Sequence, residues 1–188
     1  AERRPCDNAA AAHSNPMSFA DTTPSHALCP EPPTMNSPTP EETARRCADI
    51  MWPDDHAAQG LGIEVIDVGP GSARVTMAVR QDMVNVHGTC HGGFIFAVAD
   101  TAFAYACNSQ NHRTVASGVD ISFVAPAHLG DRLTAHGHAR QQGGRSGVYD
   151  IEVENQDGKL VALFRGRAAR IKGHFFEMPD NPASPEGR

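Results

Sequence analysis

The sequence predicts an α+β domain in which an antiparallel β-sheet wraps around one central, buried helix. The segment 94–106 is apolar on every face of a helical projection except at Asp100, which is typical of a helix enclosed by other structure. Six strand-like segments surround it, two before and four after, with turn residues between neighbours. One buried helix with antiparallel hairpins packs economically when the sheet curves around the helix.

A short amphipathic helix is predicted to open this domain. Thr39 is a favoured N-cap residue, Pro40 suits the first helical position, and Glu42 completes a capping box. The apolar residues that follow at helical spacing are Ala44, Cys47, Ala48 and Met51. Pro53 ends the pattern because proline cannot continue a helix.

The strands are predicted from runs of β-branched and apolar residues bounded by turn residues. They are 61–68, 73–79, 114–124, 132–141, 147–155 and 160–171. The turns between neighbours contain Gly69-Pro70-Gly71, Gly143-Gly144 and Asp157-Gly158. An Asp-Gly pair is a strong hairpin signal, so the last two strands are expected to pair with each other.

The predicted domain lies between two tails. Residues 1–38 are rich in Pro, Ala, Ser and Thr and contain few large apolar side chains. Such a segment buries too little surface to offset the entropy of ordering it. We therefore expect a disordered tail over 1–38, one domain over 39–174, and a second disordered tail over 175–188.

Composition excludes several classes of function. The chain has 188 residues and a formal net charge of −6, which argues against a general nucleic-acid binder. Its five cysteines match no zinc pattern and no compact disulfide framework, so reduced thiols are expected. No apolar run is long enough to span a bilayer, and no secretory signal opens the chain. We expect a cytoplasmic protein without nucleic-acid or membrane partners.

A glycine pair stands at the predicted start of the buried helix. The first N–H groups of a helix have no partner within it and carry the positive end of its dipole. Because Gly92 and Gly93 have no side chains, a ligand atom can approach these N–H groups closely. The pair suits a thioester or ester carbonyl whose oxygen becomes negative during attack. A plain tight turn into the helix is the alternative.

Asp100 is the only charged residue between Phe94 and Asn111. A carboxylate in apolar surroundings is costly unless it is paired or functional, and desolvation is expected to raise its pKa. Strongly perturbed carboxylates cluster at active sites. The alternative is a structural Asp hydrogen-bonded to a neighbouring backbone group or to Thr101. Together with the glycine pair, a functional role is favoured.

The spacing of these residues suggests a site shared between two chains. Gly93 and Asp100 are seven residues apart, or about 10 Å along a helix. A general base must lie within about 3 Å of the group that it activates. Two copies of the helix, antiparallel and side by side, would bring Gly93 of one chain to Asp100 of the other.

Two further arrangements in the loop are weaker. His87 and His91 are four residues apart, but the surrounding glycines predict a loop and no third metal ligand is evident, so no metal is expected. Cys90 precedes His91, yet neighbours in sequence rarely form a catalytic dyad. A role for His91 in shaping the loop or in hydrogen bonding near the substrate is favoured.

Three parts of the sequence resemble a known family: NVHGTCHGG with the following ADTAFAYACNSQ, then VASGVDISFVAP, then GVYDIEVENQDGKLVALFRGRAARI. They are similar to the hotdog-fold acyl-CoA thioesterases, above all to the PaaI type of phenylacetate catabolism. The similarity covers about residues 45–173. It implies the hotdog fold, a hydrolase that needs no cofactor because CoA is part of the substrate, and self-association as a homodimer or homotetramer.

The resemblance also implies roles for individual residues. The matching positions are Asp100, Gly93, Gly92, Asn85, His91 and Ser117. Asp100 matches the catalytic carboxylate, acting as general base or nucleophile, and Gly93 with Gly92 matches the oxyanion-binding helix start. Asn85 matches a loop residue that positions the thioester or water, with His91 in support. Ser117 matches a strand hydroxyl that faces the acyl group.

Contacts to the CoA phosphates are harder to assign. Relatives often carry a basic residue before the proline of the FVAP segment, where this chain has Ala125. Arg145, Arg165 and Arg167 are the remaining candidates.

The function expected from this resemblance is hydrolysis of an acyl-CoA thioester, with an aryl-acetyl or hydroxyphenylacetyl acyl group. One alternative is a hotdog enoyl-CoA hydratase, since Asp82 and His87 loosely echo the Asp/His loop of those enzymes. A non-catalytic acyl-CoA sensor is the other alternative.

Overall fold

The computed structural model describes residues 37–178. Its helices are α1 (Pro40–Met51), η1 (Trp52–Asp54), α2 (His56–Leu61), η2 (Gln81–Met83) and α3 (Gly92–Asn108). Its strands are β1 (Ile63–Gly69), β2 (Ser72–Ala78), β3 (Thr114–Phe123), β4 (Arg132–Gly143), β5 (Ser146–Glu154) and β6 (Leu160–Arg170). Of the two tails predicted over 1–38 and 175–188, residues 1–36 and 179–188 lie outside the described residues.

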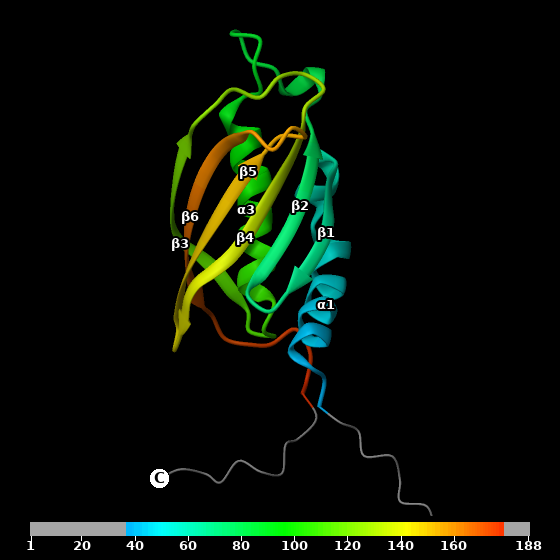
Figure 1. Ribbon diagram of the computed structural model, residues 1–188. Coiled ribbons are helices and arrows are strands. Elements are labelled where there is room, and N and C mark those ends of the chain that lie inside the picture. The colour runs from blue at the N-terminus through cyan, green and yellow to red at the C-terminus, as the bar shows by residue number, and fades with distance from the viewer. Residues whose placement is uncertain (1–36, 179–188) are drawn as a thin grey trace, which may run out of the picture. The chain divides into compact units, whose positions relative to one another are not determined.

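The six strands form one antiparallel sheet that curves around α3 (Figure 1). Their order is β1-β2-β4-β5-β6-β3, so β3 crosses from the end of α3 to the far edge of the sheet. Every neighbouring pair is antiparallel. This arrangement is the hotdog fold, and it confirms the predicted sheet around a central helix.

Helix α1 begins as its sequence predicts. The Glu42 N–H donates to the Thr39 hydroxyl over 3.1 Å, and the Thr39 N–H donates to the Glu42 carboxylate over 2.8 Å. The short helix α2 was not predicted. Asp55 caps it by accepting from the Ala58 N–H, and Gly62 ends it with a φ of 70°, a left-handed conformation that glycine adopts readily.

Helix α3 packs against the concave face of the sheet. Its buried side chains include Ile95, Val98, Ala99, Ala102, Phe103 and Ala106. The apolar sequence predicts a helix enclosed on every side, but the sheet leaves one side of α3 partly exposed. Seven residues between the second position of the helix and its last turn remain at least partly exposed to solvent. They are Gly93, Phe94, Phe96, Ala97, Asp100, Thr101 and Ala104. Most of these recur every three or four residues, so they form one stripe along the helix.

The two ends of α3 are anchored at opposite ends of the sheet. At the start, the Cys90 N–H donates to the Ala127 carbonyl over 2.8 Å, beside the connection between β3 and β4. At the other end, the Ser109 hydroxyl accepts from the Gly71 N–H over 2.7 Å, in the turn between β1 and β2. These contacts fix the direction of α3 relative to the strands.

Residues after β6 return to the end of α3. The Asn111 side chain accepts from the Phe175 and Phe176 N–H groups and donates to the Phe176 carbonyl. The Arg46 guanidinium of α1 lies 4.1 Å from the centre of the Phe176 ring. Residues 175 and 176, which composition assigned to a tail, are thus attached to the domain through their backbone and through the Phe176 ring.

Cys47, Cys90 and Cys107 are buried free thiols, whereas Cys6 and Cys29 lie outside the described residues. Among the helices between residues 37 and 178, none has the length and apolar character needed to cross a bilayer.

Candidate active site

Asn85 organises the loop that precedes α3. Its side-chain carbonyl accepts from the His87 N–H over 2.9 Å and from the Thr89 N–H over 3.3 Å. Its amide nitrogen donates to the Thr89 hydroxyl over 3.1 Å. Gly88 turns the chain with a φ of 74°. The Asn85 side chain therefore holds the loop, which sets the position of the residues that follow.

The start of α3 is covered by two aromatic rings. His91 is the N-cap, and its Nδ1 accepts from the Gly93 N–H over 3.0 Å. A Cβ atom at Gly92 would lie 2.9 Å from the Phe123 ring, and one at Gly93 would lie 3.3 Å from the His91 Nδ1. At Gly92 a side chain would require the Phe123 ring to move, whereas at Gly93 the tight contact is with the exposed His91 ring. The predicted glycine pair at the start of the helix is thus present, with the Gly93 N–H held by the neighbouring imidazole.

Asp100 lies half-buried on α3. Desolvation raises the pKa of its carboxyl group, as its apolar surroundings predict. Within residues 37–178, no ion pair or side-chain hydrogen bond satisfies this carboxylate at the distances of such contacts. The Thr101 hydroxyl instead donates to the Ala97 carbonyl over 2.9 Å. The structural alternative, in which a neighbouring backbone group or Thr101 satisfies the Asp100 carboxylate, therefore finds no such hydrogen bond in the described residues.

Gly93 and Asp100 share the partly exposed stripe of α3. Both lie on the side of the helix that the sheet does not cover, but two helical turns separate them, or about 10 Å along the axis. One chain therefore does not bring the two groups to a single carbonyl.

Ser117 lies on β3, the edge strand on the side of β6. Its hydroxyl donates to the Arg167 carbonyl over 3.1 Å, at a point where the register between β3 and β6 shifts. The side chain is exposed. This hydrogen bond reaches only the backbone of Arg167, and among the described residues no hydrogen bond joins the Ser117 side chain to Gly93, Asp100, Asn85 or His91.

Two of the three candidate CoA contacts point away from α3. Along β6 the buried residues face the helix, so Arg165 and Arg167 face the opposite side of the sheet. Arg165 makes two hydrogen bonds to the Asp150 carboxylate, of 2.6 and 2.8 Å, and Arg167 pairs with Asp120. Arg145 is exposed in the turn between β4 and β5. The sequence did not predict these two ion pairs, because Asp150 and Asp120 lie on β5 and β3, the strands that neighbour β6 in the sheet, rather than on β6 itself.

The residues proposed for a thiol–histidine dyad and for a hydratase loop make other contacts. The pKa of the Cys90 thiol is raised by burial, and its sulfur faces the His91 carbonyl at 3.7 Å, whereas the His91 Nδ1 is bonded to Gly93. Asp82 is exposed and pairs with Arg80, whose hydrogen bond lowers the pKa of the carboxyl group. Over the part of the chain that the structure describes, no cluster of three His, Cys, Asp or Glu residues is arranged to hold a metal ion.

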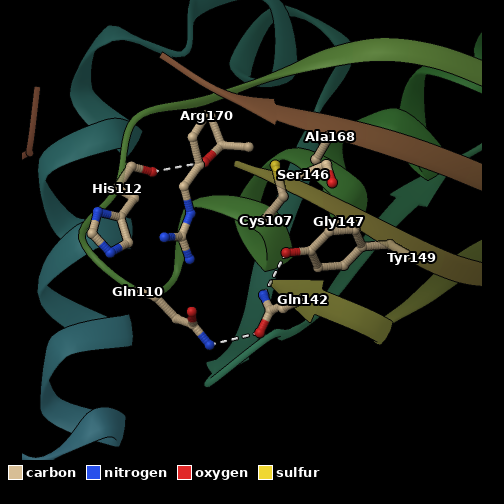
Figure 2. Close-up of a pocket in the computed structure, with 10 residues that line it drawn as sticks. Cys107, Gln110, His112, Gln142, Ser146, Gly147, Tyr149, Ala168 and Arg170 are labelled. Atoms are coloured by element: carbon tan, nitrogen blue, oxygen red, sulfur yellow. Dashed lines mark hydrogen bonds between the residues drawn. The ribbon is translucent and has the colours of Figure 1, made fainter. Parts of the chain in front are cut away.

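A small cavity lies at the opposite end of α3, where sequence analysis had singled out no site (Figure 2). Gln110 donates to the Gln142 side-chain carbonyl over 2.6 Å, and the Gln142 amide donates to the Tyr149 hydroxyl. Burial raises the pKa of the adjacent Cys107 thiol to about 12. These side chains satisfy one another, and the cavity is separated from Gly93 by most of the length of α3.

Comparison with known proteins agrees with this geometry. Residues 87–162 match the Thioesterase superfamily. The chain is 52% identical over 126 residues to the acyl-coenzyme A thioesterase PaaI of Escherichia coli K12, an alignment that covers 67% of this chain and 90% of the relative.

Solved structures give the same grouping. The E. coli PaaI protein from the phenylacetic acid degradation operon superposes with a TM-score of 0.71 at 49% identity, over 72% of this chain and 99% of that one. A Streptococcus mutans UA159 protein bound to acetyl CoA superposes with a TM-score of 0.58 at 25% identity, over 60% of this chain and 90% of that one.

The fold and the loop thus define a hotdog-fold protein of the thioesterase superfamily. Within that superfamily, the chain belongs to the acyl-CoA thioesterases of the PaaI type.

Proposed function

We propose that this protein hydrolyses aryl-acetyl-CoA thioesters at active sites that are each built from two protomers. The observation that carries the proposal is the placement of Gly93 and Asp100 on one partly exposed face of α3, two turns apart. Each group has half of the chemistry that thioester hydrolysis requires. A second helix, antiparallel to the first, would supply the other half.

The edge strand β3 supports this dimer. It pairs with β6 on one side only, and its other side leaves backbone groups without a strand partner among the described residues. Apolar side chains at both ends are exposed, Val115 by 46% and Phe123 by 54%. An exposed edge with apolar residues is a template for pairing. Antiparallel pairing of two β3 strands about a two-fold axis would also set two α3 helices antiparallel. Two such dimers would make the expected homotetramer.

The mechanism follows from the two groups. The thioester carbonyl oxygen binds the Gly93 N–H, which stabilises negative charge as the carbonyl is attacked. Asp100 of the other chain removes a proton from water, or attacks the carbonyl directly. The tetrahedral intermediate then expels the CoA thiolate. After direct attack, water hydrolyses the resulting anhydride between Asp100 and the acyl group, which releases the acid and restores the carboxylate. A carboxylate with a raised pKa is a stronger base than an ordinary one, which suits the first of these roles.

Asn85 and Ser117 are proposed to position the reactants. Asn85 holds the loop that ends in His91, and Ser117 brings a hydroxyl to the edge strand. The surroundings of Asp100 on the same face of α3 are apolar, with Phe96, Ala97 and Ala104. This lining supports an apolar acyl group, and the relative from the phenylacetic acid degradation operon supports an aryl-acetyl group.

Subunit complementation tests the shared site. Gly93→Pro removes the N–H donor, and proline is tolerated in the first turn of a helix. Asp100→Asn removes the base while keeping the shape of the side chain. Each variant alone is expected to lose activity by orders of magnitude. When the two chains are mixed and allowed to exchange, half of the dimers are mixed and each has one intact site, so about a quarter of wild-type activity returns.

Gly93→Ala is the matched control, because it adds a methyl group and keeps the N–H. It is expected to retain far more activity than Gly93→Pro. If the mixed sample stays inactive although mass spectrometry shows mixed dimers, each site lies within one chain and the proposal is wrong. If Asp100→Asn alone keeps near-normal activity, the mechanism is wrong.

The substrate and the reaction type are tested with a panel of aryl and aliphatic acyl-CoAs. Release of free thiol, greatest for the aryl-acetyl members, is expected. Loss of enoyl absorbance from crotonyl-CoA without thiol release would identify a hydratase instead. Tight binding of acyl-CoA without either reaction would identify a sensor.

A further inference from the structure

The imidazole of His91 already accepts the hydrogen bond from the Gly93 N–H, the donor to which the thioester carbonyl is proposed to bind. Its Nδ1 accepts the Gly93 N–H over 3.0 Å. That N–H has a single hydrogen, so it serves one acceptor well at a time. The ring also fills the space beside Gly93, where a Cβ atom would lie 3.3 Å from Nδ1. A carbonyl oxygen therefore cannot take the Gly93 hydrogen while the ring stays in place.

The surroundings of His91 permit the ring to leave. The side chain is exposed, and its ring contacts Phe94 edge-on, with centroids 6.3 Å apart. Among the side-chain hydrogen bonds of residues 37–178, the bond to Gly93 is the one that involves a ring nitrogen of His91. Rotation about the side-chain torsions would thus break one hydrogen bond and little packing. The helix would remain capped by the incoming oxygen.

We propose that His91 is an internal competitor of the substrate: it caps the Gly93 N–H between turnovers and is displaced by the thioester carbonyl. This inference rests on the proposed function, since it assumes that Gly93 is the oxyanion donor. His91 then acts as a positioning residue. It keeps the start of α3 ordered in the free enzyme, and it weakens binding of every ligand that must take its place.

Two unreactive CoA analogues isolate this competition. One carries a ketone separated from sulfur by a methylene group, so it retains the carbonyl and resists hydrolysis. The other is a thioether of matched length without a carbonyl. The measured quantity is the ratio of their dissociation constants, thioether over ketone. A change in loop shape alters both constants, whereas competition for the Gly93 N–H alters only that of the ketone.

His91→Ala removes the acceptor and is expected to raise this ratio about two- to tenfold, the size of one hydrogen bond. His91→Asn removes the ring but keeps an N-cap acceptor, so the ratio is expected to stay closer to that of the wild type. His128→Ala is the matched control, because His128 is an exposed histidine near the same end of α3 and its side chain makes no hydrogen bond to the helix start. It is expected to leave the ratio unchanged.

Nuclear magnetic resonance of the wild-type protein tests the same competition without any substitution, through the chemical shifts of the Gly93 amide and of the His91 Nδ1. The ketone analogue is expected to shift both the Gly93 amide and the His91 Nδ1 resonances, and the thioether neither. If the Gly93 amide shifts while Nδ1 does not, and His91→Ala leaves the ratio unchanged, the competition is refuted and the oxyanion role of Gly93 stands. If the ketone leaves the Gly93 amide unshifted, the proposed function itself fails at this residue.

Discussion

The ring of Phe103 lies directly on the backbone of Gly166. A Cβ atom at Gly166 would come within 2.7 Å of two ring carbons, and the ring is only 1% exposed. The absence of a side chain on β6 at this point is what allows α3 to approach the sheet so closely. The ring is also fixed on its other sides, by Tyr149 at 5.4 Å and Phe164 at 5.9 Å between centroids.

Gly166→Ala is therefore expected to destabilise the domain. The ring has no space to move into, and overpacking of a filled core costs about 1–3 kcal/mol. Chemical denaturation measures this as a lower free energy of unfolding. Gly60→Ala is the control, since a Cβ atom at Gly60 in α2 meets no atom within 4 Å. Alanine there is expected to be neutral or to stabilise by about 0.5–1 kcal/mol. Equal effects of the two changes would contradict the close packing of α3 on β6.

Asp100 predicts an acid limb in the pH dependence of the reaction. The carboxylate must be charged to act as base or nucleophile, and desolvation raises its pKa above the ordinary value of 3.8. The ratio kcat/KM is expected to fall as the pH decreases through this raised pKa. The rate is best followed by thioester absorbance, because thiol reagents react slowly in acid. A rate that stays level down to the ordinary pKa would show that Asp100 is not titrated in the reaction.

The same shift predicts that Asp100 destabilises the fold at neutral pH. The folded protein binds the proton of Asp100 more tightly than the unfolded chain does, so the charged carboxylate costs stability once the pH exceeds the unfolded pKa. This cost is complete above the folded pKa and absent in acid below the unfolded pKa. Asp100→Asn is expected to melt at a higher temperature than the wild type at neutral pH. The difference should shrink as the pH falls through the folded pKa and vanish once the pH is well below the ordinary value of 3.8. A variant that is less stable at neutral pH would mean that the carboxylate has a stabilising partner.

Cys107 is expected to be inert in the native protein. Burial raises the pKa of its thiol to about 12, so almost no thiolate is present at neutral pH, and the thiolate is the reactive form. Peptide mapping after brief alkylation should find Cys107 unmodified in the folded protein and modified after denaturation. Cys90 supplies a comparison within the chain, because it is buried at the other end of α3. Rapid native labelling of Cys107 would show that the cavity of Figure 2 opens to solvent.

Local signals in the sequence determined most of the elements. The capping box at Thr39, the six strand segments and the apolar helix ahead of Asn108 were all predicted, because capping and periodicity act over only a few residues. The chemical types at the site, glycines at a helix start and one desolvated carboxylate, were equally visible. A short helix such as α2 was missed because six residues carry too little periodicity.

Only the tertiary structure decided how these parts meet. Strand order placed β3 at an unpaired edge, and the register of β6 with its neighbours turned Arg165 and Arg167 to the outer face of the sheet. The cap of His91 on the Gly93 N–H depends on side-chain torsions at the start of α3, which residue types alone do not specify. Sequence thus determined which groups are present and on which elements, since those properties are local. The structure decided which groups face one another, because that depends on contacts between segments far apart in the chain.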